Sequence, residues 1–509
     1  MKKIQPFRWI VCLTLPLFMM SAPWAVSEEK KIRPLFTVTL DPTVSKEPVS
    51  GRIYLVLSKS QSSTITPEPR WVDPDPFFSQ NITTIKPGET IRLGNDLKGF
   101  PLENLEKIAP GSYWASAALD LNKASRKIFS SEGNFYSKSV QVQIGQNSLL
   151  PTELVLNAVF HEPAFPETEL VKLAQMESNS LTKFNGRKTR IRAGVALPAS
   201  YKTNPTKKYP VVYEIPGFGG NHFAALSSPV RGKTLLETEE VVHITLDPDC
   251  PLGHHTFADS ANNGPWGYAL TQEFIPFLEK EFRLIPEPWA RLVTGHSSGG
   301  WSSLWLQVKY PSIFGGVWST APDPVDFRDF QRINLYSPNQ NMFKDEKGVS
   351  RPIGRKGETP FLFYKPFSDM EEVMARGGQL GSFEAVFSDR DAMGNPKKLW
   401  DRKTGVVDQF VAETWKKYDI HLILENNWAT LSSKLQGKIH VYMGSLDTFY
   451  LEGATRLLGD SLKKLGSDAK VELFEGKDHS SIMDANLRNR INKEMATAIQ
   501  LGRQKNSNR

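Results

Sequence analysis

Apolar and polar residues alternate in short runs over residues 33–158. The runs are LFTVTL, GRIYLVLS, SYWASAALDL, SVQVQI and ELVLNAVF, and Pro, Gly, Asn and Ser separate them. Because alternate side chains of a strand point to opposite faces, this pattern is typical of strands that are buried on one face. We therefore expect an all-β, sandwich-like N-terminal domain built from antiparallel strands.

Residues 159–187 follow a different pattern. They open with the proline-containing segment HEPAFPETEL, and the stretch ELVKLAQMESNSL has the composition of a short helix. This segment predicts a linker followed by a packing helix.

From residue 188 onward, strand-like runs alternate with helical ones. The strand-like runs are IRAGVALP, YPVVYEIPG, VVHITLD, ARLVTG, FGGVWSTAP, KIHVYMG and KVELFEG, and amphipathic stretches such as WGYALTQEFIPFLEKEF lie between them. This alternation predicts an α/β domain over residues 188–509, with a mostly parallel, doubly wound sheet covered by helices on both faces.

The segment at about 327–436 is too long for a single crossover between neighbouring strands, since it holds more than 100 residues. An insertion at this place in an α/β sheet lies near the strand ends, where ligands bind. Two interpretations stay open. The insertion either caps the site or is a structural elaboration away from it.

The first 27 residues have the pattern of an export signal. MKK and Arg8 give a positive start, WIVCLTLPLFMM is an apolar core, and AVS before Glu28 supplies small residues at a cleavage site. Pro16 and Pro23 interrupt an apolar run that barely reaches the length of a bilayer span, which favours cleavage over an uncleaved anchor. We expect an exported protein, periplasmic or secreted, with no stable membrane span after cleavage.

Size and charge narrow the class of protein further. A chain of 509 residues exceeds what one compact core usually serves, which favours two domains. The net charge of +7 falls to +4 once the three basic residues of 1–27 are removed, too little to indicate a nucleic-acid partner. Cys250 is then the last remaining cysteine and cannot form an internal disulfide; we interpret it as packed core or inert surface rather than a nucleophile.

The fragment RLVTGHSSGG contains the pattern G-x-S-x-G around Ser297. A strand-like run precedes it and a helical run follows, which is the setting of a strained turn that exposes a nucleophilic serine. Gly295 and Gly299 let the strand and helix backbones pass closely. The alternative is that Ser297 or Ser298 only caps the helix.

A serine nucleophile needs a base and an acid, and in this fold class the chain order is serine, acid, histidine. Three of the nine histidines follow the motif. His421 lies in the insertion and His440 in a strand, whereas His479 lies in a polar loop just after a strand, so we predict His479 as the base. Asp447 follows the preceding strand and is the predicted acid, with Asp323 as the fallback one strand earlier.

The tetrahedral intermediate also needs amide donors for its oxyanion. The backbone N–H of Ser298 is one candidate, because this residue follows the nucleophile. The strand YPVVYEIPG ends in a glycine-rich loop, and we predict the N–H of Phe218 as the second donor, with Gly219 as the next choice. The alternative is that these glycines only form a turn.

The ordered set PGFGG, GHSSGG, GSLDTFY and GKDHS resembles the family described as "putative esterase", within the α/β-hydrolases. This family includes esterase D-like, feruloyl, acetylxylan and enterochelin esterases, and the likeness covers residues 185–500. The segment FADSANNGPWGYAL looks like the family segment before the helix that precedes the nucleophile strand. Pro216 departs from the pattern, since many members have histidine before the oxyanion glycines.

The resemblance implies an α/β-hydrolase fold and hydrolysis of a carboxylic ester through a Ser-His-Asp triad and an acyl-enzyme. The implied substrate is a carbohydrate-linked, aryl or siderophore-type ester, and neither a metal nor a cofactor is needed. Gly219, Ser260, Asn262 and Asn263 are candidates to contact the substrate, although local backbone hydrogen bonds explain such turn residues equally well.

Two other functions stay open at this point. An acyltransferase would use a hydroxylated acceptor in place of water, and an inactive hydrolase fold could serve as a glycan-binding or partner-binding protein. His254 and His255 are adjacent on an extended segment without nearby ligand spacing, which favours a structural role over a metal site. The sequence leaves the oligomeric state unknown.

Overall fold

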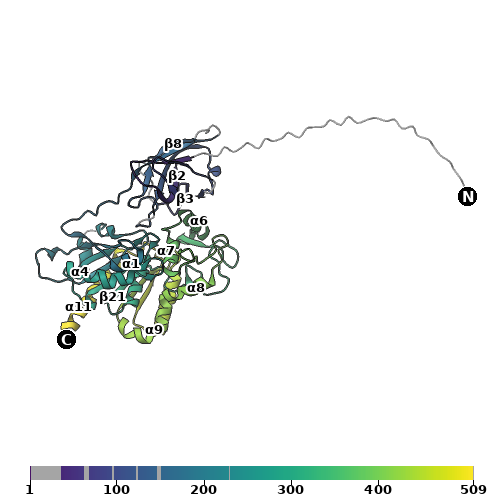
Figure 1. Ribbon diagram of the computed structural model, residues 1–509. Coiled ribbons are helices and arrows are strands. Elements are labelled where there is room, and N and C mark those ends of the chain that lie inside the picture. The colour runs from purple at the N-terminus through teal and green to yellow at the C-terminus, as the bar shows by residue number, and fades with distance from the viewer. Residues whose placement is uncertain are drawn as a thin grey trace.

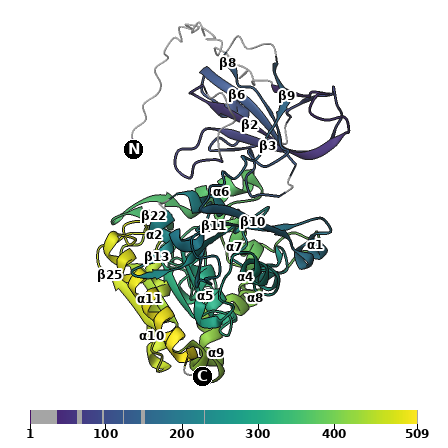
Figure 2. The same cartoon turned by 90° about the vertical axis from the view of Figure 1, so that its left-hand side faces the viewer.

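The computed structural model describes residues 1, 36–61, 68–94, 97–121, 124–145, 151–227 and 230–507. Apart from residue 1, the export signal expected at 1–27 lies outside these residues. Figures 1 and 2 show a β-rich N-terminal region beside a larger α/β region, with α6 (Tyr364–Met374) at the junction between them. Among the described helices, none combines the length and apolar character needed to cross a bilayer.

The β-rich region contains one nine-stranded sheet in the order β4-β1-β9-β7-β6-β2-β3-β5, and β8 also pairs with β6. Its pairs are antiparallel except for the parallel pair of β1 and β9. The strands are β1 (Phe36–Leu40), β2 (Val49–Ser58), β3 (Phe77–Ile85), β4 (Thr90–Arg92), β5 (Lys98–Phe100), β6 (Gly111–Asp120), β7 (Phe135–Ser137), β8 (Val140–Ile144) and β9 (Thr152–Val159).

The alternation in this sheet explains its core. Val38 of β1, Leu55 of β2, Phe78 of β3 and Leu119 of β6 are buried in a single apolar cluster. The sequence predicted an all-β, sandwich-like domain of antiparallel strands, and the structure has a single branched, mostly antiparallel sheet.

The α/β region contains an eight-stranded mixed sheet in the order β10-β11-β15-β12-β20-β21-β24-β25. The pairs β10–β11 and β11–β15 are antiparallel, and the pairs from β15 to β25 are parallel. The strands are β10 (Val171–Glu177), β11 (Arg190–Ala196), β12 (Val211–Ile215), β15 (Val242–Leu246), β20 (Arg291–His296), β21 (Gly316–Thr320), β24 (Ile439–Gly444) and β25 (Lys470–Phe474).

The packing helix expected within 159–187 is largely a strand. Residues 171–177 form β10, an edge strand with buried Val171 and Ala174, and a short helix α1 (Asn179–Asn185) follows it. Ser178 caps α1 by accepting a hydrogen bond from the N–H of Leu181. Pairing with β11 along seven residues outweighs the weak helical preference of this segment.

Helices cover both faces of the mixed sheet. Val293 and Val441 face one core, together with α4 (Ile275–Glu281), α5 (Ser298–Lys309), α9 (Ile420–Leu435) and α10 (Glu452–Lys464). Their strand neighbours Leu292 and Tyr442 face a second core with α11 (Ala485–Ser507). The alternation of side chains along each strand therefore separates the two layers.

The segment after β21 forms a hairpin of β22 (Pro352–Lys356) and β23 (Thr359–Phe363), then α6, α7 (Gln379–Phe387) and α8 (Gln409–Trp415), and it ends in α9. Short elements precede α4, and they are α2 (Val230–Thr234), β13 (Leu235–Leu236), β14 (Glu239–Glu240), β16 (Asp249–Cys250), β17 (Gly253–His254), β18 (Asp259–Ser260), β19 (Gly264–Pro265), α3 (Trp266–Tyr268) and a π-helix at Ala269–Phe274.

Candidate active site

Ser297 lies at the turn between β20 and α5. Its φ of 60° and ψ of −126° place a non-glycine residue in a strained backbone conformation. Strain of this kind is tolerated at functional sites, where the surrounding structure holds it in place. The turn presents the Ser297 side chain at the carboxyl edge of the sheet.

Two glycines make this turn possible. A Cβ on Gly295 would lie 2.1 Å from the carbonyl oxygen of Gly299, and a Cβ on Gly299 would lie 1.9 Å from the carbonyl oxygen of Ile215. Real Cβ atoms do not approach oxygen this closely, so strand and helix can pass each other here only if both residues lack a side chain.

Asp447 and His479 meet at the same edge of the sheet. Asp447 follows β24, His479 follows the neighbouring strand β25, and His479 Nδ1 lies 2.7 Å from Asp447 Oδ2. Because a carboxylate only accepts, Nδ1 donates and Nε2 keeps its lone pair. The N–H of Phe449 donates to the other Asp447 oxygen (2.8 Å), which fixes the carboxylate.

The surroundings of His479 set its proton affinity. Burial lowers the pKa of the imidazole, but the charge and hydrogen bond of Asp447, with smaller effects of Asp323 and Asp478, outweigh burial and raise it above its usual value. A base with a raised pKa accepts a proton more readily.

Ser297 and His479 line one cavity of about 350 Å³. Within the described residues, no hydrogen bond joins Ser297 Oγ to the imidazole. The structure thus brings the predicted nucleophile and base to the same cavity without closing their contact. Such contacts are often long in unliganded enzymes and tighten when substrate binds.

The two predicted oxyanion amides lie beside Ser297. A Cβ on Gly217 would lie 3.2 Å from the Ser297 Cβ, which shows how closely the loop after β12 approaches the nucleophile. Phe218 also lines the cavity. In the part of the chain that the structure describes, the N–H groups of Phe218 and Ser298 have no hydrogen-bond acceptor, so both are available as donors.

His254 contacts the backbone of the loop that carries Phe218. Its Nε2 lies 2.9 Å from the carbonyl oxygen of Pro216, and its Nδ1 accepts from the N–H of Thr256 at 3.1 Å. Burial lowers the pKa of His254 to about 4, so it is a neutral donor to Pro216. His255 stacks on Trp266 with 3.7 Å between ring centres. Both histidines therefore make structural contacts, in line with the sequence interpretation.

Asp323 anchors the residue next to the nucleophile. Its Oδ2 accepts from Ser298 Oγ at 2.5 Å and lies 3.4 Å from Gln379 Nε2. Burial raises the pKa of Asp323 to about 6, although the hydrogen bond from Ser298 opposes this shift. Asp323, the fallback acid, thus contacts Ser298, whereas Asp447 contacts the imidazole.

The cavity around Ser297 is lined mainly by apolar side chains. Seven of its lining residues come from the insertion: the apolar Ile353, Leu362, Phe367, Leu380 and Phe383, and the polar Gln331 and Gln379. Arg355 of β22 donates to the backbone carbonyl of Asp447 at 2.9 Å, which ties the insertion to the loop that carries the acid. Of the two interpretations of the insertion, the structure supports the one in which it covers the site.

The four residues expected to contact substrate do not line this cavity. Gly219 is next to Phe218 but outside the lining, and Ser260 Oγ accepts from the N–H of Asn263 at 3.0 Å. Asn262 donates to the carbonyls of Ala385 and Ser388 (3.1 and 2.8 Å). Ser260 thus satisfies a nearby backbone group, as the alternative explanation expected, whereas Asn262 bonds to backbone carbonyls of the insertion, 123 and 126 residues later in the chain.

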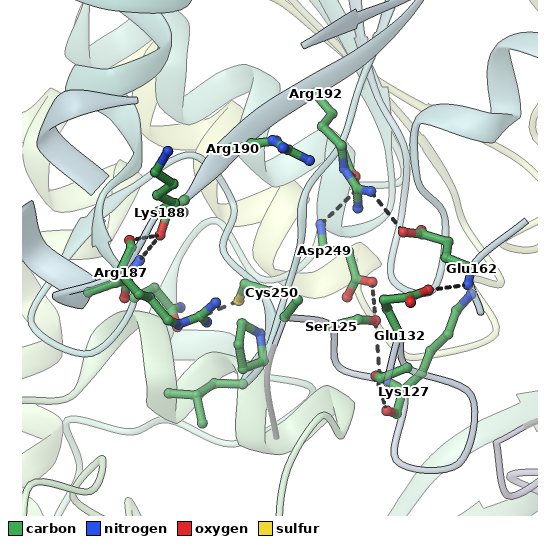
Figure 3. A pocket seen from close by; sticks show the side chains of 18 of the residues that line it. Ser125, Lys127, Glu132, Glu162, Arg187, Lys188, Arg190, Arg192, Asp249 and Cys250 are labelled. Carbon is green, nitrogen blue, oxygen red and sulfur yellow. Dashed lines mark hydrogen bonds and ion pairs between the residues drawn. The ribbon is translucent and has the colours of Figure 1, made fainter. Parts of the chain in front are cut away.

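Asn262 and Asn263 line a different cavity of about 610 Å³, between the β-rich region and the start of β11 (Figure 3). Charged side chains surround it, including the ion pairs of Arg192 with Asp247 (2.9 Å) and Glu162 (3.0 Å). Cys250 also borders it, and burial raises the pKa of its thiol, which makes it a poor nucleophile. None of the predicted catalytic residues lines this second cavity.

One group of potential metal ligands occurs among the described residues. Asp326, Asp419 and His421 are buried and place their ligand atoms within 4.8 Å of one another. Arg328 donates to both oxygens of Asp326, and its Nη2 lies 3.2 Å from His421 Nε2. The guanidinium therefore already supplies the positive charge at this group, which lies outside the cavity of Ser297.

Sequence reasoning missed Trp71, Gln379 and Phe449 as residues of this site. Each lines the cavity. Trp71 and Gln379 lie outside the motifs, whereas Phe449 lies within GSLDTFY but was given no role. Phe449 packs edge-on against the His479 ring, with 4.9 Å between ring centres. Its place two residues after Asp447 is the one signal that could have identified it.

Several known proteins resemble this chain. A 138-residue stretch is 32% identical to an uncharacterized protein, YbbA, of Bacillus subtilis; it covers 25% of this chain and 54% of that protein. The chain thus spans about half the length of this curated relative. Two solved structures are also similar. A ferulic acid esterase is 13% identical, and the match covers 65% of this chain and 97% of that protein. An S-formylglutathione hydrolase from Agrobacterium tumefaciens is 15% identical, and the match covers 65% of this chain and 95% of that protein. Their TM-scores are 0.40 and 0.39.

The family model described as "Putative esterase" matches residues 185–466, more than half of the chain. The match includes β20, Ser297 and the insertion, and it ends after α10. The chain therefore belongs to the family described as "Putative esterase".

Proposed function

We propose that this enzyme is an exported serine esterase in which Ser297 is the nucleophile, His479 the base and Asp447 the acid. The observation that carries the proposal is the hydrogen bond of His479 to Asp447 beside the cavity that holds Ser297. The three residues follow β20, β24 and β25, which are parallel strands of one sheet, so all three lie at the same edge, where α/β enzymes bind ligands.

The first half of the reaction forms an acyl-enzyme. Nε2 of His479 takes the proton of Ser297 Oγ, which attacks the ester carbonyl carbon. The carbonyl oxygen becomes an anion and accepts hydrogen bonds from the N–H groups of Phe218 and Ser298. Collapse of this intermediate breaks the bond to the alcohol oxygen, and the alcohol leaves with the proton from Nε2.

The second half releases the acid. A water molecule gives a proton to Nε2 of His479 and attacks the acyl carbon. The same two amides hold the second oxyanion, and its collapse frees the carboxylic acid and returns the proton to Ser297 Oγ. Asp447 stays ionised throughout, orients the imidazole and stabilises its charged form.

The substrate class in this proposal is an ester of a carbohydrate, an aryl acid or a siderophore-type acid. The cavity of about 350 Å³ supports an ester with one compact apolar group, because apolar and aromatic side chains form most of its lining. The proposal that the protein is exported depends on the signal pattern of residues 1–27. The mass of the protein recovered outside the cytoplasm shows whether this segment has been removed. A chain that still begins at residue 1 would contradict cleavage before Glu28.

Labelling with a fluorophosphonate probe tests the nucleophile. We expect the wild type to be labelled, and Ser297→Ala to lose both labelling and turnover by roughly 10⁴-fold or more. Ser480→Ala is the matched control, since Ser480 lines the same cavity and should leave labelling intact. A folded wild type that resists the probe, or a Ser297→Ala variant that is still labelled, would rule out the assignment.

A further inference from the structure

The N-terminal β-rich region contributes a side chain to the catalytic cavity. Trp71 lies in the connection between β2 and β3, and it lines the cavity together with Ser297 and His479. The catalytic residues all come from the α/β region, so Trp71 reaches them from a different part of the fold.

Trp71 is in contact with three aromatic rings around the cavity. Ring centres lie 6.0 Å apart for Phe218, 5.1 Å for Phe367 and 5.9 Å for Phe449. The contacts with Phe367 and Phe449 are edge-to-face, the arrangement that aromatic pairs favour. One indole therefore touches the oxyanion loop, the insertion and the loop after Asp447.

Two of these partners act directly on the chemistry of the proposed site. Phe218 carries one of the proposed oxyanion amides, and Phe449 packs against the imidazole of His479 at 4.9 Å. A second residue of the β-rich region, Arg126, also contacts Phe218. Its guanidinium lies 4.7 Å from the centre of the Phe218 ring. Substitution of Trp71 thus changes the lining of the cavity and the packing of Phe218 and Phe449, which lie next to the proposed catalytic groups.

Buried polar contacts join the β-rich region, which carries Trp71, to the insertion. Arg376 of the insertion forms a salt bridge with Asp120 of β6 (2.5 Å), and both side chains are buried. Ser79 Oγ donates to the carbonyl of Val373 at 2.7 Å, and Tyr54 Oη donates to that of Met374 at 2.5 Å. Figure 2 shows α6, which ends at Met374, directly below β3. These contacts dock the β-rich region on the insertion.

We propose that Trp71 is a specificity-determining residue that limits the size of the ester group entering the cavity, so that the active site is complete only with the β-rich region in place. This inference rests on the proposed function, because it assumes that the ester binds beside Ser297. The favoured substrates are esters whose bound group is compact and apolar, and larger groups are excluded by the indole.

Turnover of two series of p-nitrophenyl and alkyl esters tests the proposal. One series lengthens the acyl chain and the other lengthens the alcohol. In one of the two series, we expect Trp71→Ala to raise the ratio of kcat/KM for long esters to kcat/KM for short esters about tenfold. The reason is that each additional methylene buried in an apolar pocket improves binding. Trp71→Phe should give an intermediate ratio and keeps the test usable if the alanine variant folds poorly.

Val72→Ala is the matched control, because Val72 is the next residue and its side chain is 51% exposed. It should leave both profiles unchanged. Fluorophosphonate labelling of the same variants separates the two proposals. If wild type and Trp71→Ala are labelled but neither profile shifts, the role of Trp71 is wrong while the nucleophile stands. If the folded wild type is not labelled, the proposed function itself is wrong.

Discussion

At the scale of the residue, two adjacent serines have different surroundings. Ser297 has a strained backbone and a side chain that lines the cavity, whereas Ser298 Oγ is held by Asp323 at 2.5 Å. The anchored side chain of Ser298 holds its amide where the proposed oxyanion would form. Asp323 therefore acts on the site through Ser298 and through its charge near His479.

We predict that Asp323→Asn moves the acid limb of the pH profile to lower pH. The charge of Asp323 is one of the effects that raise the pKa of His479. His479 must be neutral to accept a proton, so kcat/KM rises as the pH passes its pKa. Asparagine removes the negative charge but can still accept from Ser298 Oγ, and the lower pKa of His479 lets activity begin at a lower pH.

The profile of kcat/KM between pH 4 and pH 9, measured with a soluble p-nitrophenyl ester, checks this expectation. Asp460→Asn is the matched control, because Asp460 is exposed on α10 away from the cavity. Its profile should coincide with that of the wild type. An acid limb of Asp323→Asn that stays in place or moves to higher pH contradicts the electrostatic role.

The sequence predicted some of these residues better than others. Ser297, Asp447 and His479 follow three strands in a fixed chain order, and parallel strands bring such loops together, so the spacing was informative. Asn262 and Asn263 carried no comparable constraint. The structure shows Asn262 bonded to backbone carbonyls of the insertion, 123 and 126 residues later in the chain, and a local pattern contains no sign of such contacts.

At the scale of the element, the strand–turn–helix around Ser297 was predictable because its glycines leave a pattern in the sequence. The edge strand β10 was not, because the segment 169–181 mixes helix-forming residues with a weak alternation. Pairing with β11, a partner some 20 residues later in the chain, decides its conformation, and a local pattern does not contain that information. The insertion was recognised by length alone, and its role as a cover depends on tertiary contacts.

At the scale of the whole molecule, the β-rich region and the α/β region share an apolar core. Tyr54, Phe77 and Phe129 of the former are buried in one cluster with Phe367 and Val373 of the latter. The sequence predicted two domains but contained no sign that they pack together. Trp71, Phe218 and Phe449 are far apart in the chain, so their contact could be found only from the folded structure.

A buried ion pair also joins the two regions. Arg376 donates to both oxygens of Asp120 and also to the backbone carbonyls of Ser125 and Pro251. The Arg376 and Asp120 side chains are 7% and 3% exposed, so removal of the guanidinium leaves a buried carboxylate without this cation. We predict that Arg376→Met lowers the free energy of unfolding by about 3–5 kcal/mol.

Urea unfolding and steady-state kinetics together check this prediction. Lys365→Met is the matched control, because Lys365 lies on α6, which ends two residues before Arg376. Its ion pair with Asp369 is about half exposed, where such pairs contribute about 1 kcal/mol or less. Arg376→Met/Asp120→Asn should recover part of the lost stability, since it removes the buried charge as well. We also expect kcat/KM of Arg376→Met to fall, because Trp71 lines the cavity and Arg126 contacts Phe218 only while the β-rich region is docked. Equal stability and activity of Arg376→Met and Lys365→Met would mean that the ion pair does not hold the two regions together.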